Sequence, residues 1–101
     1  MHMMIRVTID VVSGNEAIRS GKLGKVMGDF AAKFKPEAMY FTTDSGVRTA
    51  YIVFDMKDVT DMPAIAEPFF MELNADVDYL PVMNKDELTA GLGKYMQGAA
   101  H

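Results

Sequence analysis

The stretch Arg48-Thr49-Ala50-Tyr51-Ile52-Val53-Phe54-Asp55 decides the fold, because it has the composition of a β-strand and is apolar on both faces. Alternate residues of a strand point to opposite faces of a sheet. One face carries Ala50, Ile52 and Phe54, and the other carries Thr49, Tyr51 and Val53. A chain of 101 residues with one layer of helices covers only one face of an open sheet. A second copy of the chain, a ligand or a nucleic acid must therefore cover the other face.

Composition and charge indicate one ordinary globular domain spanning residues 1–101, with residues 97–101 expected to form a loose tail. Half of the residues are hydrophobic and 24% are charged. The net charge of -4 provides no attraction to phosphate backbones or to an anionic membrane. Cysteine is absent, which excludes disulfides and thiolate chemistry. No apolar run approaches the ~18 residues that a membrane span needs, so we expect a cytoplasmic protein.

The N-terminal third predicts a strand followed by a helix. Residues 3–12 alternate between apolar and polar side chains, which is typical of a strand. Ser13-Gly14-Asn15 has the composition of a turn and helix cap, and we expect the helix to begin there. Gly21 and Gly24 are expected to interrupt this helix, because glycine is unfavourable in a helix interior. The helix should end at Lys35, since Pro36 disfavours helical geometry in the residue before it.

The remainder predicts a hairpin, a helix, a strand and a last helix. Residues 38–42 should pair with Val47–Asp55 through the polar loop 43–46. Met62–Leu73 has a helical apolar stripe, kinked at Pro68. Residues 77–82 should form a fourth strand. Asn84 and Glu87 form a capping box for a helix over residues 85–96, in which Leu88, Leu92 and Met96 recur at four-residue spacing.

This order of elements predicts an α+β domain with the ferredoxin-like βαββαβ arrangement and an extra C-terminal helix. In that arrangement a four-stranded antiparallel sheet carries its helices on one face. The same layout serves enzymes, metal carriers, regulatory ligand-binding domains and RNA-binding domains. The function must therefore be argued from the side chains.

RNA binding is disfavoured. Residues 50–54 match the end of the signature found on the third strand of RNA-recognition motifs, but Val47, Arg48 and Thr49 replace its basic, glycine and aromatic positions. The first strand also lacks an aromatic residue on which a base could stack. Together with the acidic balance, these departures predict no nucleic-acid partner.

Metal and nucleophilic sites are also disfavoured. The two histidines, His2 and His101, lie at the chain ends without carboxylates at ligand spacing, so we expect no metal. The methionines on apolar stripes, such as Met27 and Met96, are interpreted as core filler. Without cysteine or an internal histidine, the usual nucleophilic triads are unavailable to the chain. No cofactor is expected, and the catalytic residues, if any, are unknown.

The uncovered sheet face holds the candidate site. Its polar candidates are Arg6, Thr8, Asp10, Tyr40, Thr49 and Tyr51, beside the apolar Met4 and Val53. An apolar surface with an arginine, tyrosine hydroxyls and a carboxylate is typical of a small-molecule pocket. The alternative is that Arg6 and Asp10 pair at a wet subunit interface and that the tyrosines only fill space.

The chain resembles the dimeric α/β-barrel superfamily, whose ferredoxin-like domains pair sheet to sheet around a cavity. The resemblance is carried by Tyr51-Ile52-Val53-Phe54-Asp55, by Ile65, Phe69 and Leu73 on the second helix, and by residues 77–82. These segments also resemble a group of small uncharacterised bacterial domains placed in that superfamily. Members include cofactor-independent monooxygenases, haem-degrading enzymes, lactone isomerases and polyketide cyclases. This chain lacks tryptophan and an internal histidine, so no catalytic residue is carried over.

The resemblance implies a homodimer that binds a small apolar or aromatic molecule. The composition predicts that this homodimer is cytoplasmic and has no membrane partner. If the protein is an enzyme of the monooxygenase, isomerase or cyclase type, its chemistry would be cofactor-free. Arg6 would stabilise developing negative charge, and Tyr51 or Tyr40 would transfer a proton. The alternative hypothesis is a non-catalytic binding or assembly module whose open sheet face is only a dimer interface.

Overall fold

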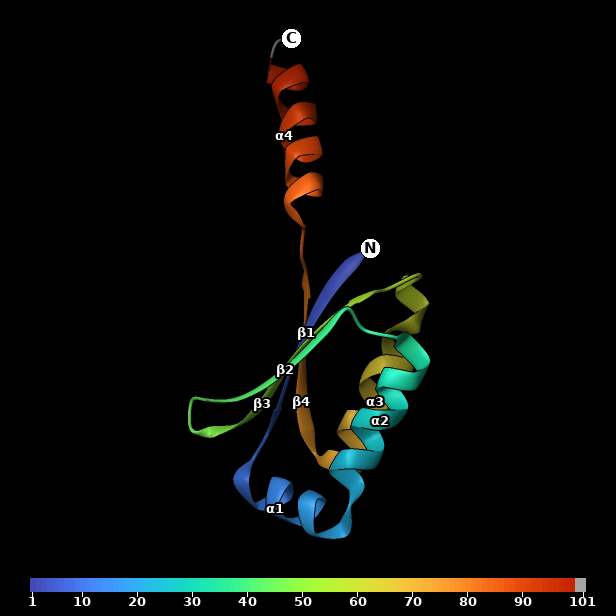
Figure 1. Cartoon of the computed structure of the whole chain (residues 1–101), viewed down its shortest axis with the longest axis vertical. Helices are drawn as coiled ribbons and strands as arrows, with labels where there is room; N and C mark the ends of the chain where they lie inside the picture. Colours follow the sequence, from blue (N-terminus) through green and yellow to red (C-terminus); the bar gives the residue numbers. More distant parts are fainter. Residues whose placement is uncertain (100–101) are drawn as a thin grey trace.

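The computed structural model describes residues 1–99 of the chain (Figure 1). The strands are β1 (His2–Ile9), β2 (Ala38–Asp44), β3 (Val47–Asp55) and β4 (Ala75–Pro81). The helices are α1 (Val11–Ser20), α2 (Lys22–Phe34), α3 (Met62–Leu73) and α4 (Lys85–Ala99), with a short 3-10 turn, η1 (Val59–Asp61), before α3.

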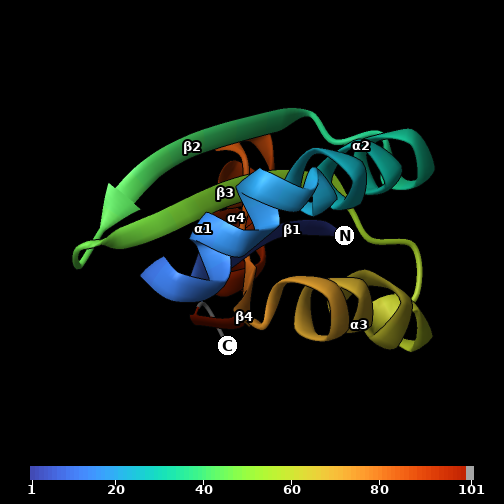
Figure 2. The same ribbon diagram turned by 90° about the horizontal axis from the view of Figure 1, so that it is seen from below.

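The four strands form one antiparallel sheet in the order β2-β3-β1-β4. α2 and α3 lie side by side on one face of this sheet, and α1 crosses its lower end (Figures 1 and 2). The predicted ferredoxin-like arrangement with an extra C-terminal helix is confirmed. The first crossover carries the chain from β1 past the position of β3 to the edge strand β2. The second carries it from β3 past β1 to the edge strand β4, so β1 and β3 occupy the centre.

The core lies between the sheet and its helices. Ala50, Ile52 and Phe54 of β3 are buried, as their alternation predicts. Phe54 packs against Phe30 of α2 with ring centroids 5.4 Å apart, and Phe30 contacts Phe69 of α3 at 5.6 Å. Both amphipathic helices thus present their predicted stripes to one face of the sheet, and burial of these aromatic rings is a main source of stability.

The junction of β1 and α1 differs from the prediction of a strand over residues 3–12. β1 ends at Ile9, and α1 already begins at Val11 because Asp10 caps it by accepting a hydrogen bond from the Ser13 amide at 3.0 Å. Gly14 therefore lies inside the helix rather than in a turn. A tertiary contact explains this glycine, since a Cβ on Gly14 would lie 2.6 Å from Nη1 of Arg48.

The other boundaries follow local chemistry more closely. Gly21, in the left-handed region at φ 81°, separates α1 from α2, whereas Gly24 is accommodated within α2. The hairpin turn contains only Ser45 and Gly46, both at positive φ, so β2 extends two residues beyond its predicted end to Asp44. β4 likewise begins at Ala75, two residues earlier than predicted. β3 and α3 have their predicted bounds, and Pro68 lies inside α3.

The C-terminal helix stands apart from the rest of the domain. α4 extends past the end of β4 into solvent (Figure 1), and none of its described residues is buried. The radius of gyration is 16.4 Å, against about 13 Å for a compact domain of this length. α4 continues to Ala99, so the predicted tail is wrong for Gln97–Ala99, and residues 100–101 lie outside the described part. Among residues 1–99, no helix is both long and apolar enough to cross a membrane.

Exchanging Gly14 for alanine tests the contact with Arg48. The guanidinium donates hydrogen bonds to the Val11 carbonyl at 3.4 Å and to the Asn15 side chain at 3.0 Å. Gly14→Ala gains about 1 kcal/mol of helix propensity. It also displaces two hydrogen bonds that stabilise by about 1 kcal/mol each. We expect the free energy of unfolding to fall by about 1 kcal/mol in the wild type.

In an Arg48→Ala background the same exchange should instead raise the free energy of unfolding by about 1 kcal/mol, because only the propensity gain remains. Urea denaturation of the four variants measures both effects. An equal gain in the two backgrounds would contradict the proposed contact.

Candidate functional site

The face of the sheet opposite the helices, called here the outward face, is ordered in three cross-strand rows. Each row crosses the strands in the order β2, β3, β1 and β4, and the register defines its members. The apolar row consists of Ala38, Val53, Met4 and Leu80. The charged row consists of Tyr40, Tyr51, Arg6 and Asp78, and the threonine row consists of Thr42, Thr49, Thr8 and Asp76. The apolar row lies at the end of the sheet from which α4 leaves, and the threonine row lies toward α1. None of the helices within residues 1–99 covers these rows (Figures 1 and 2).

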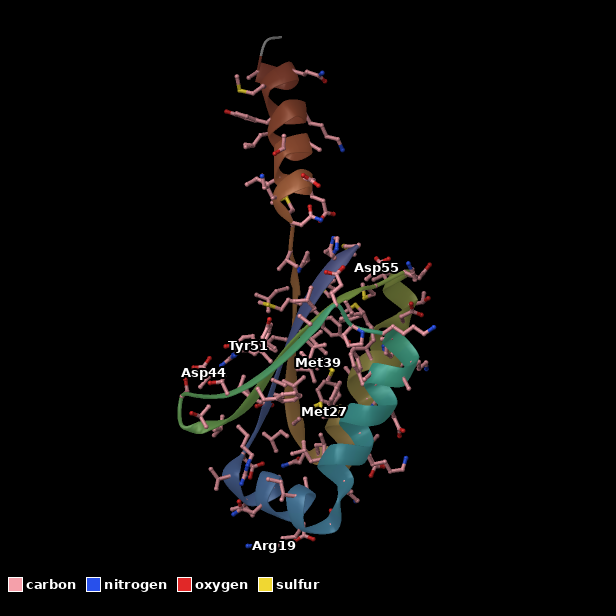
Figure 3. All side chains as sticks on the ribbon, in the orientation of Figure 1. Arg19, Met27, Met39, Asp44, Tyr51 and Asp55 are labelled. Carbon is pink, nitrogen blue, oxygen red and sulfur yellow. The ribbon has the colours of Figure 1, made fainter. Side chains whose placement is uncertain are left out.

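A charge cluster occupies the middle of the outward face. Arg6 of β1 lies 3.4 Å from the Asp78 carboxylate of β4 and 3.7 Å from the Asp44 carboxylate of β2. The Tyr51 hydroxyl of β3 donates a hydrogen bond to Asp44 at 2.6 Å. All four strands thus contribute to one cluster with one positive and two negative charges. Figure 3 shows Tyr51 and Asp44 on the opposite side of the sheet from Met27 and Met39.

Hydrogen bonding sets the protonation states of this charge cluster. The hydrogen bond to Asp44 raises the pKa of Tyr51 above its usual range, and partial burial raises it further. The same bond, aided by the charge of Arg6, lowers the pKa of Asp44. At neutral pH Tyr51 is therefore a protonated donor and Asp44 an ionised acceptor. The charge of Arg6 is shared between two carboxylates.

Five of the six residues proposed from the sequence lie on the outward face. Arg6 and Tyr51 are cross-strand neighbours, Thr8 is opposite Thr49, and Tyr40 is opposite Tyr51. Tyr51 is partly covered, Tyr40 is 71% exposed, and the Thr49 hydroxyl is buried and donates to the Val47 carbonyl at 3.1 Å.

Asp10 is the exception, because the strand ends before it. Its carboxylate caps α1 and also accepts a hydrogen bond from Asn74 at 3.3 Å, which ties the start of α1 to the end of α3. Hydrogen bonds from Ser13 lower the pKa of Asp10. Asp10 is therefore a structural residue at this junction, and it forms no pair with Arg6.

The two carboxylates that do pair with Arg6 were missed by the sequence argument. Asp44 was assigned to the hairpin loop, and only the two-residue turn after it places it on the strand. Asp78 lies on β4, whose facing the sequence argument left open. The alternation of Asp76, Asp78 and Leu80 with Ala75, Val77 and Tyr79 was the signal that could have located it.

The outward face has no evident metal-binding centre. Across residues 1–99, no group of three or more histidine, cysteine, aspartate or glutamate side chains is arranged to hold a metal ion. Asp44 and Asp78 instead share one arginine, which offsets part of their negative charge. The cluster can orient a polar group of a small molecule through the Arg6 and Tyr51 donors and the two carboxylate acceptors.

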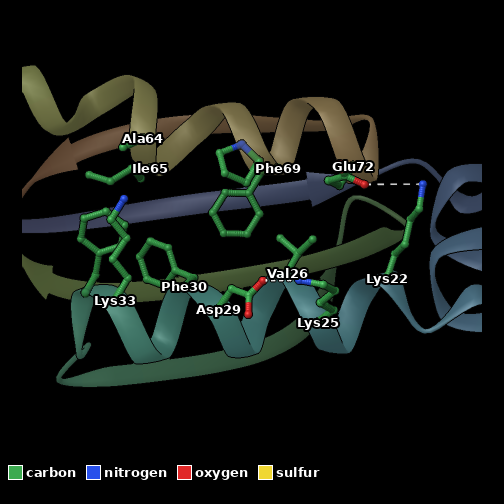
Figure 4. Close-up of a pocket in the computed structure, with 12 residues that line it drawn as sticks. Lys22, Lys25, Val26, Asp29, Phe30, Lys33, Ala64, Ile65, Phe69 and Glu72 are labelled. Carbon is green, nitrogen blue, oxygen red and sulfur yellow. Dashed lines mark hydrogen bonds and ion pairs between the residues drawn. The ribbon is translucent and has the colours of Figure 1, made fainter.

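A hollow lies on the helix side of the domain, between α2 and α3 (Figure 4), and has a volume of about 320 Å³. Its floor is formed by core residues that include Phe30 and Phe69. On its rim Lys22 pairs with Glu72 at 3.5 Å and Lys25 pairs with Asp29 at 2.7 Å. Lys33 also lines the hollow, and its ammonium lies 5.4 Å from the centroid of the Phe34 ring. Both carboxylates of the lining are thus paired with lysines, and we interpret this hollow as a shallow seam between two packed helices.

The comparisons with known proteins provide no family assignment. No protein-family model matches the chain, and a search of curated proteins finds no relative. We therefore infer the function from the geometry of the outward face.

Removing the Tyr51 hydroxyl tests the charge cluster. Folding lowers the pKa of Asp44 below its ordinary value of 3.8, so the ionised carboxylate stabilises the native state at pH values above 3.8. This stabilisation is lost as the pH falls through the lowered pKa of the folded protein. Tyr51→Phe removes the main cause, so the pKa of Asp44 should rise toward 3.8. The native state should then lose this stabilisation at a higher pH. NMR titration of the carboxyl carbon measures the shift.

Tyr40→Phe is the matched control. It also removes a tyrosine hydroxyl from the charged row, but the Tyr40 hydroxyl makes no hydrogen bond to Asp44 in the described structure. An Asp44 titration that is the same in both variants would contradict the cluster.

Proposed function

We propose that two copies of this chain pair through their outward faces and enclose a small, largely apolar or aromatic molecule between the two sheets. The observation that carries this proposal is the uncovered outward face, where an apolar row lies beside a charge cluster built from all four strands. Ligand pockets are typically apolar with a few placed polar groups, which is the composition of these two rows. The arrangement agrees with the resemblance to dimeric α/β barrels.

The apolar row supports pairing. Val53 and Met4 are partly exposed on the two central strands, Leu80 is 39% exposed, and Tyr40 in the neighbouring row is 71% exposed. A second sheet packed about 10 Å away would remove these side chains from water. Covering both faces of the central strands in this way accounts for the apolar composition of β3 on its two sides.

The charge cluster favours binding over catalysis. The raised pKa of Tyr51 makes its hydroxyl a reluctant proton donor, and the lowered pKa of Asp44 makes that carboxylate a weak base. Arg6 is already shared by Asp44 and Asp78, so its charge is less available to a developing oxyanion. We therefore propose a binding role as the basic function, to which cofactor-free chemistry would be an addition.

The alternative is a dimer whose outward faces meet without enclosing a ligand. The pairing of Arg6 with carboxylates of its own chain favours this alternative, because the cluster then needs no external partner. The two possibilities share the same interface and differ in whether a cavity remains between the sheets.

The interface is tested by placing a charge in the apolar row. Val53→Lys should convert the wild-type dimer to a folded monomer, since burying an unpaired ammonium in an apolar interface is costly. Met71→Lys is the matched control, because Met71 is an apolar residue on α3, 80% exposed and away from the outward face. Sedimentation equilibrium gives the masses and circular dichroism verifies the fold. A Val53→Lys protein with the mass of a dimer would refute the proposed interface.

The cavity is tested with Nile red, an uncharged aromatic dye whose fluorescence increases in apolar surroundings. We expect saturable binding to the wild-type dimer and to Met71→Lys, and loss of the signal in monomeric Val53→Lys. A wild-type dimer that leaves the dye fluorescence unchanged would favour the alternative without a cavity.

A further inference from the structure

The C-terminal helix carries an apolar stripe that no other part of residues 1–99 covers. Leu88, Leu92, Tyr95 and Met96 follow one another at spacings of four, three and one residues, which places them on one side of α4. Their exposed fractions lie between 47% and 69%. Met96, interpreted from the sequence as core filler, is 64% exposed, so the structure corrects that interpretation.

This helix cannot depend on its own stability. An isolated helix of 15 residues is marginal in water even for alanine-rich sequences. α4 contains Gly91, Gly93 and Gly98, and each glycine costs about 1 kcal/mol relative to alanine. From Leu88 to its end the helix has a single charged residue, Lys94, which is unusual for a helix surrounded by solvent. Packing of the stripe against another surface would supply the missing stability.

The base of α4 is directed away from its own domain. Asn84 and Glu87 cap each other's amides, with distances of 3.0 and 2.8 Å. Glu87 also pairs with Nδ1 of His2 at 2.6 Å, and the Val82 amide donates to the His2 carbonyl at 3.1 Å. These contacts anchor the first turn at the start of β1, and Figure 1 shows the helix continuing outward from that point. The stripe therefore does not reach the helices or the sheet of its own chain.

We propose that α4 is an exchanged arm, whose apolar stripe packs against a second copy of this chain. This inference rests on the homodimer of the proposed function. The stripe begins at the same end of the sheet as the apolar row, because the row ends at Leu80 of β4 and α4 begins at Lys85. Met83, in the connection between them, is also exposed, at 63%. In a two-fold dimer the row and the stripe each occur twice, so a partner packed on the row lies beside both.

The size of the stripe fits this role. Four half-exposed side chains of this kind can bury roughly 300–400 Å² on each partner, about half of the ~800 Å² per partner found in standard interfaces. The outward face supplies the remainder. A membrane surface is a poorer occupant, because α4 carries two basic and two acidic residues and so lacks the basic face that attracts anionic lipid.

The absence of cysteine from the chain allows a direct test by paramagnetic labelling. Ala90 is exposed and lies on the side of α4 opposite the stripe, so Ala90→Cys provides a single attachment point for a nitroxide. The spin-labelled, unenriched chain is mixed with an unlabelled ¹⁵N-enriched chain and allowed to exchange subunits. Broadening of ¹⁵N amide signals then reports contact between copies. We expect broadening that disappears when the nitroxide is reduced.

A pair of double variants shows whether the stripe makes this contact. Leu88→Glu with Leu92→Glu should abolish the broadening and raise the dimer dissociation constant at least about tenfold, since each buried leucine contributes 1.5 kcal/mol or more. Ala90→Glu with Gln97→Glu adds the same charge on the opposite side of α4 and should leave the dissociation constant unchanged.

The outcomes separate the arm from the dimer on which it rests. The exchanged arm would be overturned if the wild-type dimer showed no broadening between copies and if the leucine exchanges left its dissociation constant unchanged. That result would leave the proposed function intact. A wild-type chain that is monomeric at all concentrations would overturn both.

Discussion

A single layer of helices can bury only one face of a four-stranded sheet, and the rest of this structure depends on that constraint. α2 and α3 cover the face that carries Ile52 and Phe54, and no helix in the described part of the chain covers the opposite face. The central strands β1 and β3 nevertheless place partly apolar side chains on the uncovered side, including Met4 and Val53. Exposed apolar rows of this kind mark interaction surfaces, which is why the outward face and the proposed pairing are linked.

The electrostatics of the outward face limit the chemistry that it can support. Arg6, Tyr51 and the two carboxylates of Asp44 and Asp78 satisfy one another, so the cluster is a preorganised set of donors and acceptors. Such a set is suited to orient the polar group of the ligand in the proposed function. The pKa shifts oppose proton transfer at neutral pH, because they stabilise the phenol and the carboxylate in their resting states. Geometry and protonation thus both favour binding.

The apolar row of the sheet and the apolar stripe of α4 lie toward the same end of the sheet. α4 carries an apolar stripe, and its first turn contacts its own domain where His2 and Glu87 meet. The apolar row of the sheet lies at that same end. A partner that covers the row is therefore also well placed to cover the stripe. The proposed dimer and the proposed exchanged arm follow from this one spatial relationship.

The sequence by itself determined the elements whose signals are local. The proline after Lys35 ended α2, Asn74 ended α3 in the left-handed conformation, and the Asn84–Glu87 pair capped α4 as predicted. The alternation within β3 likewise identified its core face. These features depend on steric and hydrogen-bonding preferences within a few residues, so the sequence contains them directly.

Only the tertiary structure decided the features that depend on distant partners. Asp10 changed from a proposed site residue to a helix cap, because β1 ends one residue before it. Gly14 is explained by Arg48, a residue 34 positions later in the chain. Asp44 and Asp78 joined Arg6 through the strand register, which fixes neighbours across a sheet and is set by the whole core. The direction of α4 was decided in the same way, by a contact with His2 at the other end of the chain.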